Sequence, residues 1–196
     1  DGCMMEGVTS EAASLAGHLG LSSLVWIYDS NGISIDGSTQ LAFTEDVGAR
    51  FEAYRWRVIR AGDANDLAAV DRALKDAIAE PDRPTLVIVD SVIGYGAPTK
   101  AGTAAAHGEP LGAEEIRKAK EFYGWDPDAK FLVPPEAAAH MGDAMRERGE
   151  RLVLEWNQRF AAWAKDHPDR ARQWKLLQDG QFPEGWDADI PSFPPD

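Results

Sequence analysis

Three predicted strands, separated by amphipathic segments, constrain the fold of this chain more than any other feature. They are SLVWIYD (23–29), WRVIRAG (56–62) and PTLVIVDSVI (84–93). The first, SLVWIYD, is a continuous apolar run, as expected of a strand that is buried on both faces of a parallel sheet. The segments before and between the runs predict helices, which gives the order helix–strand–helix–strand–helix–strand. We therefore predict an α/β fold built on a doubly wound parallel sheet.

Local signals place the helices around these strands. Small residues in MEGVTSEAASLAGHLGL predict a helix from about Met5 that packs closely against the sheet. Thr44 is the expected N-cap of the next helix, through EDVGARFEAY, and Asn65 or Asp66 the expected N-cap of a third. The apolar stripe of that third helix is Leu67, Val70, Leu74 and Ile78.

We expect three parts along the chain. Residues 1–125 form the α/β domain, with its N-terminal portion missing, and residues 126–179 form a helical extension of the same domain. Residues 180–196 are rich in Pro, Gly and Asp and are expected to be a linker. Both ends look interrupted, so we expect a piece of a longer protein. One apolar helix face in the extension is formed by Val153, Trp156, Phe160 and Trp163.

Composition narrows the class of partner and the compartment. The chain has 33 acidic and 20 basic residues, and its formal net charge of -13 argues against nucleic acid or an anionic membrane as the main partner. No apolar run approaches the length of a membrane span, and no secretory signal is recognisable. Cys3 is the single cysteine, which excludes an internal disulfide and favours a reducing, cytoplasmic location. We expect Cys3 to be a small buried residue rather than a reactive thiol.

Candidate chemistry lies at the ends of the predicted strands. Ligands of open α/β sheets bind outside the carboxyl ends of strands, and DSNGI (29–33) and IGYGAPTKAGTAAAHG (93–108) both follow such ends. Asp1 and Asn31 offer a carboxylate and an amide oxygen, and Ile33 a backbone carbonyl, which together suit Mg²⁺.

The start of the chain also suits a phosphate. Gly2 has no Cβ, so its N–H can approach a phosphate closely, and the positive end of the following helix would favour the anion. Turns at Asp1-Gly2 and Asn31-Gly32 are the commoner explanation of such pairs, so the residues alone leave both interpretations open.

The order of these motifs resembles a known family. An Asp-Gly pair, a strand and then Asn31 resemble the second part of the thiamine diphosphate signature, whose first glycine would lie just before residue 1. The stretches that resemble transketolase cover nearly the whole chain in the expected order. They are DGCMMEGVTSEAASLAGHLGL, DSNGISIDG, FTEDVGARFEAYRWRVIR, IGYGAPTKAGTAAAHGEPLG and WNQRFAAWAKDHP. The end, PEGWDADIPSFPPD, resembles the linker to that family's pyrimidine-binding domain.

The resemblance implies the thiamine diphosphate-binding fold, with thiamine diphosphate and Mg²⁺ as cofactors and Ca²⁺ as a possible substitute. The implied metal ligands are Asp1, Asn31 and the carbonyl of Ile33. The implied cofactor-binding residues are Gly2, Glu6, Asn31, Ile33, Ile35 and His107. Among these, Gly2 would contact the diphosphate, Ile35 would lie near the cofactor, and Glu6 would join a carboxylate network that links the two cofactor sites of a dimer.

His107 is the implied catalytic residue, near the cofactor and the donor substrate. A histidine there can hydrogen-bond a sugar hydroxyl or move a proton near neutral pH. Ala104 departs from the family, which often has a second histidine at this position. The other histidines, His18, His140 and His167, are expected to be structural or surface residues.

The implied reaction transfers a two-carbon ketol unit from a ketose phosphate to an aldose phosphate, as in the pentose phosphate pathway. The implied partners are sugar phosphates, a second full-length copy in a homodimer, and the missing pyrimidine-binding domain. That domain carries the glutamate that activates the cofactor, so we expect this chain alone to be inactive. Two alternatives stay open: a subunit of a split transketolase or of another thiamine diphosphate enzyme such as dihydroxyacetone synthase, and a non-catalytic αβ binding module.

Overall fold

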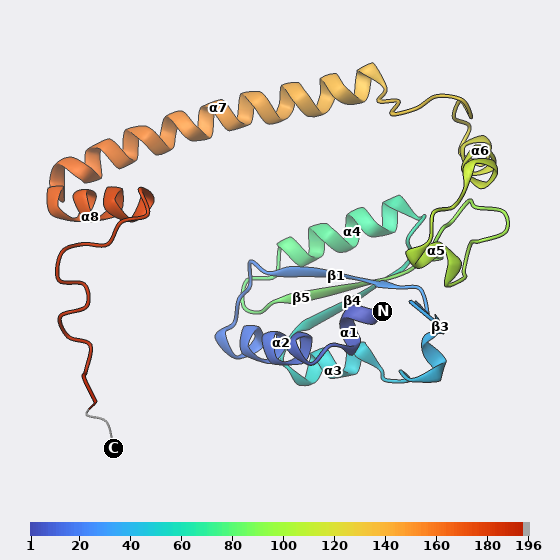
Figure 1. Ribbon diagram of the computed structural model, residues 1–196, viewed down its shortest axis with the longest axis horizontal. Helices are drawn as coiled ribbons and strands as arrows, with labels where there is room; N and C mark the ends of the chain where they lie inside the picture. The colour runs from blue at the N-terminus through green and yellow to red at the C-terminus, as the bar shows by residue number, and fades with distance from the viewer. Residues whose placement is uncertain (194–196) are drawn as a thin grey trace. The chain divides into compact units, whose positions relative to one another are not determined.

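The computed structural model describes residues 1–193 and divides the chain into two compact units (Figure 1). The first unit is residues 1–130, and the second begins at Phe131. The predicted division of the chain at residues 125 and 179 stays a prediction. No helix within residues 1–193 combines the length and the apolar character that a membrane crossing needs.

The first unit contains a three-stranded parallel sheet in the order β1–β5–β4. Its strands are β1 (Val25–Ser30), β4 (Arg57–Asp63) and β5 (Thr85–Asp90). Its helices are α1 (Gly2–Met5), α2 (Gly7–Leu19), α3 (Val47–Ala53), α4 (Leu67–Ile78), α5 (Ala105–Gly108) and α6 (Ala113–Phe122), with a 3-10 turn η1 (Thr39–Leu41). The predicted parallel sheet and the α/β fold class are confirmed.

The three strands end at the same edge of the sheet. Asp90 at the end of β5 pairs with Ser30 at the end of β1 and with Asp63 at the end of β4. The loops that follow β1 and β5 therefore leave the sheet side by side, at the edge where α/β proteins bind ligands.

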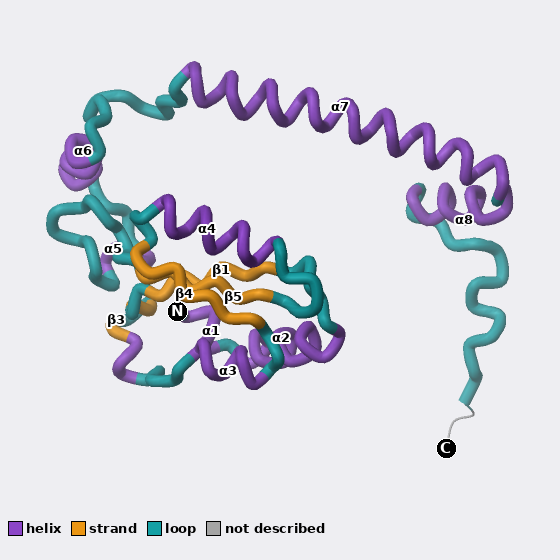
Figure 2. The backbone as a smooth tube through the Cα atoms, turned by 180° about the vertical axis from the view of Figure 1, so that it is seen from behind, coloured by secondary structure: helices purple, strands orange, loops and turns teal. Residues whose placement is uncertain are grey.

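Strand β5 contributes to a core on each side of the sheet. Leu86 and Ile88 pack in the core that includes residues of α2 and α3, whereas Val87 and Val89 pack in the core that includes residues of α4. This alternation is the period of two expected of a strand. Figures 1 and 2 show α4 on one face of the sheet and α2 and α3 on the other, so the doubly wound arrangement is confirmed.

The core under α2 is centred on Trp56. The indole is 1% exposed, lies 5.1 Å from Phe51 between ring centroids, and donates its Nε1–H to the Ala13 carbonyl at 2.8 Å. One turn further along α2, a Cβ added to Gly17 would lie 1.8 Å from the carbonyl oxygen of Tyr54. The close packing predicted for this small-residue helix is therefore confirmed.

The predicted cap of α3 was wrong, whereas one of the two candidates for α4 was right. Asp46 caps α3 rather than Thr44, because its Oδ1 accepts the N–H of Ala49 at 3.0 Å, the third position of the helix. This hydrogen bond is the main reason that the pKa of Asp46 lies below its ordinary value. Asp66 caps α4 by the same bond to Ala69, also at 3.0 Å.

The single helix expected from about Met5 is interrupted. Glu6 has an extended backbone, with φ -75° and ψ 136°, so α1 ends at Met5 and α2 begins at Gly7. The long helix therefore begins two residues later than expected, and the role of its positive end toward a phosphate stays a prediction.

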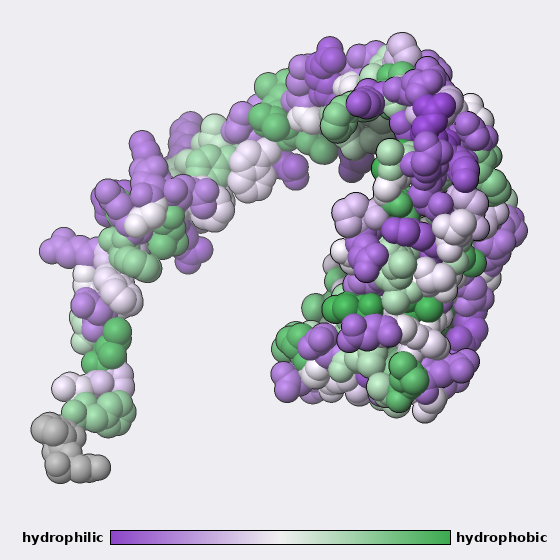
Figure 3. Space-filling view, turned by 45° about the vertical axis from the view of Figure 1, so that its right-hand side comes forward, coloured by the Kyte–Doolittle hydropathy of each residue, from purple (hydrophilic) through white to green (hydrophobic). Residues whose placement is uncertain are grey.

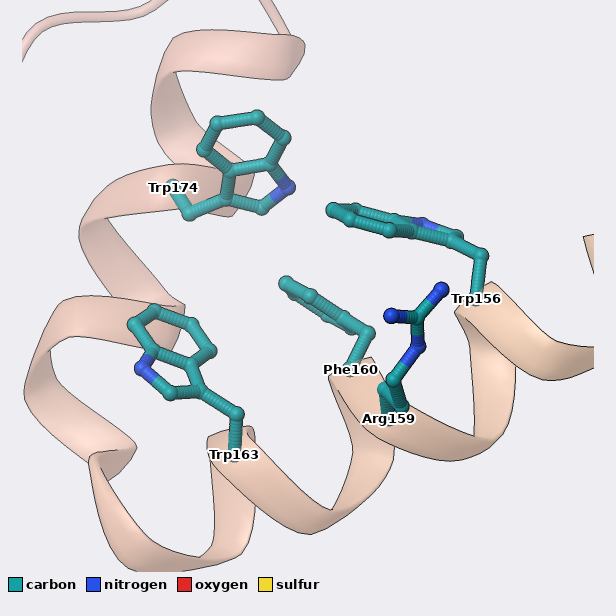
Figure 4. Close-up of a pocket in the computed structure, with 5 residues that line it drawn as sticks. All are labelled: Trp156, Arg159, Phe160, Trp163 and Trp174. Carbon is teal, nitrogen blue, oxygen red and sulfur yellow. The ribbon is translucent and has the colours of Figure 1, made fainter.

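The second unit contains α7 (Pro135–Asp166) and α8 (Pro168–Gln178). Figure 4 shows Phe160 of α7 between Trp156 and Trp163 of the same helix and Trp174 of α8. The ring centroids lie 6.0, 5.5 and 6.3 Å from that of Phe160. These aromatic rings and Arg159 line a cavity of about 390 Å³, so three of the four predicted apolar positions form this face of α7.

The fourth predicted position and the predicted linker differ from this packed region. Val153 is exposed and does not line the cavity. Residues 179–193 contain turns but no helix or strand, and residues 194–196 of the predicted linker lie outside the described part of the chain. Figure 3 shows hydrophobic and hydrophilic side chains interspersed on the surface of the second unit.

Replacing Gly17 with alanine is expected to destabilise the first unit by about 3 kcal/mol, because the new Cβ overlaps the backbone of Tyr54. The matched control is Gly7→Ala in the same helix, where an added Cβ meets no atom within 4 Å. The control should be neutral or stabilising by up to about 1 kcal/mol. Hydrogen exchange of the β5 amides measures both effects, and equal stability of the two variants would contradict the prediction.

Candidate functional site

A cavity of about 500 Å³ lies in the first unit where the start of α1 meets the end of β1. It is lined by Asp1, Gly2, Cys3, Met4, Ile27, Tyr28, Asp29, Asn31, Ile33, Ile93 and His107. The structure thus brings together five of the residues singled out from the sequence, namely Asp1, Gly2, Asn31, Ile33 and His107. Glu6 and Ile35 do not line this cavity, and both are exposed.

The Asp1 carboxylate ties α1 to the loop that follows β1. Its Oδ1 accepts the hydroxyl of Tyr28, and its Oδ2 accepts the N–H of Asn31 at 2.9 Å and of Gly32 at 2.7 Å. Gly32 has a φ of 73°, a left-handed conformation that glycine adopts without strain. The carboxylate therefore fixes the shape of this loop as well as facing the cavity.

The Asn31 side chain also shapes the backbone beside it. Its Oδ1 accepts the N–H of Ile33 at 3.0 Å, just before the short antiparallel hairpin of β2 (Ile33–Ser34) and β3 (Gly37–Ser38). The hairpin turn falls after Ser34, so Asn31-Gly32 leads into the hairpin and is not its turn. Ile35, in that turn, is 71% exposed.

Oxygen atoms that suit a hard cation remain available around Asp1. A carboxylate has about four lone-pair positions, of which Asp1 uses three, and the amide oxygen of Asn31 uses one of two. Mg²⁺ takes oxygen ligands and keeps several waters, so such a partial set fits it. No group of three or more His, Cys, Asp or Glu side chains within residues 1–193 is placed to hold a metal. A metal here would depend on one carboxylate with amide and carbonyl oxygens.

The backbone at Gly2 is open toward the cavity. A Cβ placed on Gly2 would meet no atom within 4 Å, which leaves room for a ligand to approach. Cys3 beside it is exposed, so the expectation that Cys3 is buried was wrong. The reason is the short α1, which turns Met4 rather than Cys3 into the core.

Arg50 of α3 holds the end of α1. Its guanidinium donates to the Met4 carbonyl at 2.8 Å, pairs with Glu45 at 3.1 Å, and lies 5.8 Å from the ring centroid of Phe51. The Met4 carbonyl belongs to the last turn of α1, whose carbonyls lack partners within the helix. Arg50 therefore supports the element that carries Asp1 and Gly2.

His107 reaches the same cavity from the loop after β5. It lies in α5, which begins after Ala104, the position where the resemblance leads one to expect a second histidine. Glu115, in the first turn of α6, accepts the N–H groups of Thr99 at 2.7 Å and Lys100 at 3.0 Å. The Thr99 N–H is the largest cause that lowers the pKa of the Glu115 carboxyl below its ordinary value.

Sequence reasoning missed three residues that shape this site, namely Tyr28, Arg50 and Glu115. Tyr28 is a polar group inside an apolar strand, and a buried tyrosine hydroxyl usually needs a partner, which was the available signal. Arg50 and Glu115 lie on helices where charged residues are normally solvated, so no local pattern marks them.

The family comparison agrees with the order of motifs along the chain. Residues 1–183 match the family model described as "Transketolase, thiamine diphosphate binding domain". The transketolase of Geobacillus stearothermophilus is 47% identical over 193 residues, which is 98% of this chain and 29% of that protein. The transketolase of Nostoc is 45% identical over 197 residues, again 29% of that protein. The chain thus spans under a third of the length of these curated relatives.

Solved transketolases have the same fold over this length. A mutant transketolase from Pichia stipitis in complex with xylulose 5-phosphate superposes with a TM-score of 0.86 at 41% identity, covering 98% of this chain and 28% of that one. The transketolase of Leishmania mexicana superposes with a TM-score of 0.87 at 36% identity, covering 99% of this chain and 29% of that one.

Removing the Tyr28 hydroxyl should loosen the loop after β1, which the Asp1 carboxylate binds, while leaving the core intact. The Tyr28→Phe variant keeps the buried ring but loses a hydrogen bond to a carboxylate, at a cost of about 1.5 kcal/mol. We expect faster hydrogen exchange at the amides of Asn31 and Gly32. Tyr54→Phe is the control, because the Tyr54 hydroxyl makes no hydrogen bond within residues 1–193; equal exchange in both variants would count against the role of Tyr28.

The stability supplied by Glu115 should depend on pH. Because its folded pKa lies below the ordinary value of 4.5, the contribution is fully present above pH 4.5 and is lost as the pH falls through the folded pKa. Urea unfolding of the wild type and Glu115→Gln should therefore differ most at neutral pH and converge on acidification. If the difference in unfolding free energy between the two proteins grew as the pH fell, the predicted direction of the pH dependence would be wrong.

Proposed function

Since the chain belongs to the transketolase family, we propose that it is the diphosphate-binding part of an enzyme that transfers a two-carbon ketol unit from a ketose phosphate to an aldose phosphate. The observation that carries this proposal is the single cavity lined by Asp1, Gly2, Asn31, Ile33 and His107. It contains hard oxygen ligands, an open glycine backbone and one imidazole, which are the groups that a diphosphate, its cation and a sugar require.

The proposed cofactors are thiamine diphosphate and Mg²⁺, for which Ca²⁺ could substitute. When bound, thiamine diphosphate supplies a carbanion and an electron sink. Asp1, Asn31 and the carbonyl of Ile33 would hold the cation, and the Gly2 N–H would lie against the diphosphate. The free lone pairs on Asp1 and Asn31 and the open backbone at Gly2 support this assignment.

His107 is the proposed contact to the donor sugar. A relative was solved with xylulose 5-phosphate, and we propose sugar phosphates as the substrate class of this protein also. The imidazole lines the cavity on the wall formed by the loop after β5, where it can hydrogen-bond a sugar hydroxyl or move a proton. Ala104 cannot donate a hydrogen bond, so His107 would act without a neighbouring histidine from this loop.

The remaining site residues are proposed to act in the assembled enzyme. Glu6 is exposed at the end of α1 and would join a carboxylate network across a homodimer, and the exposed Ile35 would lie near the cofactor. A pyrimidine-binding domain would supply the activating glutamate. We propose that the enzyme is cytoplasmic.

The test replaces the matching segment of the Geobacillus stearothermophilus transketolase with this chain. We expect the chimera to transfer ketol units from xylulose 5-phosphate to ribose 5-phosphate with added thiamine diphosphate and Mg²⁺, and the isolated chain to show no turnover. Asn31→Ala in the chimera should raise the Mg²⁺ concentration needed for half-maximal activity at least about tenfold.

The control for this substitution is Asn65→Ala, an exposed amide in the loop before α4 and outside the cavity. It should leave the Mg²⁺ dependence unchanged. A folded chimera without turnover, or turnover by the isolated chain itself, would contradict the proposal.

A further inference from the structure

Glu115 carries the one buried carboxyl group within residues 1–193, at 8% exposure, and it lies outside the cavity. Its carboxylate accepts the N–H groups of Thr99 and Lys100 and also the Thr99 hydroxyl, at 3.1 Å. Burying a carboxylate is costly unless such hydrogen bonds satisfy it. Glu114, its neighbour on α6, is exposed and does not bear this cost. We therefore ask what the hydrogen bonds of Glu115 hold in place.

These partners join the two ends of the loop that carries His107. We call the place where the ends meet, at Thr99, Lys100, Pro110 and Glu115, the neck of the loop. Thr99 comes before His107 in the chain and Glu115 after it, so the bond between them joins both ends of the loop. A second bond crosses the same neck, because Lys100 donates its Nζ to the Pro110 carbonyl at 3.0 Å. The segment between these ties includes α5 and therefore the imidazole that lines the cavity.

The base of this loop is packed against α6. The Tyr95 ring lies 5.5 Å from that of Phe122 between centroids, and the Tyr123 hydroxyl donates to the Tyr95 carbonyl at 2.8 Å. A Cβ added to Gly94 would lie 2.9 Å from the Cβ of Ala106 in α5. Gly94 and Ala106 therefore lie in close contact, and through this contact we expect a displacement of the loop to reach α5.

We infer that Glu115 is a positioning residue, whose carboxylate holds Thr99 and Lys100 at the neck of the loop and thereby sets where the His107 imidazole lies in the cavity. The inference rests on the proposed role of His107 in ketol transfer. Glu115 itself does not line the cavity.

The test compares Glu115→Ala and Glu115→Gln with the matched control Glu114→Ala in the full-length holoenzyme. Glu115→Ala should speed hydrogen exchange across residues 99–112 about tenfold and lower kcat/KM about 10- to 100-fold. Glu115→Gln keeps an acceptor oxygen and should be intermediate. The affinity for thiamine diphosphate should change less than kcat/KM does, because Asp1, Gly2 and Asn31 lie on other elements.

A double-mutant cycle with His107→Ala separates positioning from a general loss of structure. If Glu115 acts through His107, adding Glu115→Ala to His107→Ala should lower kcat/KM no further. Fully additive losses, unchanged exchange of residues 99–112, or a matching loss in Glu114→Ala would overturn the inference.

A failure of the proposed function gives a different result. If His107→Ala alone leaves kcat/KM unchanged, the role of His107 is overturned, and Glu115 is then a structural residue. Unchanged exchange in Glu115→Ala with a large effect of His107→Ala would overturn the positioning role alone.

Discussion

The parallel pairing of β5 with a strand on each side is the interaction on which the rest of the first unit depends. Leu86 and Val87 are fully buried on opposite faces of β5, so the strand anchors both cores. Because β1 and β5 end in register at Ser30 and Asp90, the loops after them start at the same edge. The loop after β1, which Asp1 binds, and the loop after β5, which carries His107, thus line one cavity.

The sheet could be predicted because each strand contains a run of apolar residues, although only β5 is buried along its length. Strands β1 and β4 are half-buried or exposed at most positions, so the burial of β1 on both faces that its apolar run predicts is wrong. Helix starts were harder, because Thr44 and Asp46 are both good caps and only the bond to Ala49 decides between them. The break at Glu6 was missed because its local signal is weak: Gly7 follows it directly, but an isolated glycine is also tolerated inside a helix. Asp1, Asn31 and His107 were assigned through the family resemblance, since the residues alone were also compatible with turns.

The residues that support the site were not predictable from the sequence. Arg50 and Glu115 bind backbone groups 46 and 16 residues away, contacts that depend on the complete fold. Sequence periodicity reports which face of a helix is apolar, but it does not report a charged side chain that turns inward to meet a carbonyl or an N–H. The role of Tyr28 was not predictable for the same reason, since its ring fits the core and only its hydroxyl contacts Asp1.

A loop closed at its neck by side-chain bonds can change length without moving its ends. Thr99 and Glu115 are joined whatever the number of residues between them, and the entropy of closing a flexible loop grows by only about 0.6 kcal/mol for each doubling of its length. Insertions or deletions next to α5 should therefore be tolerated by the fold far better than a change at Thr99 or Glu115. The tip of this loop is thus the part of the first unit that evolution can lengthen or shorten to reshape the entrance of the cavity.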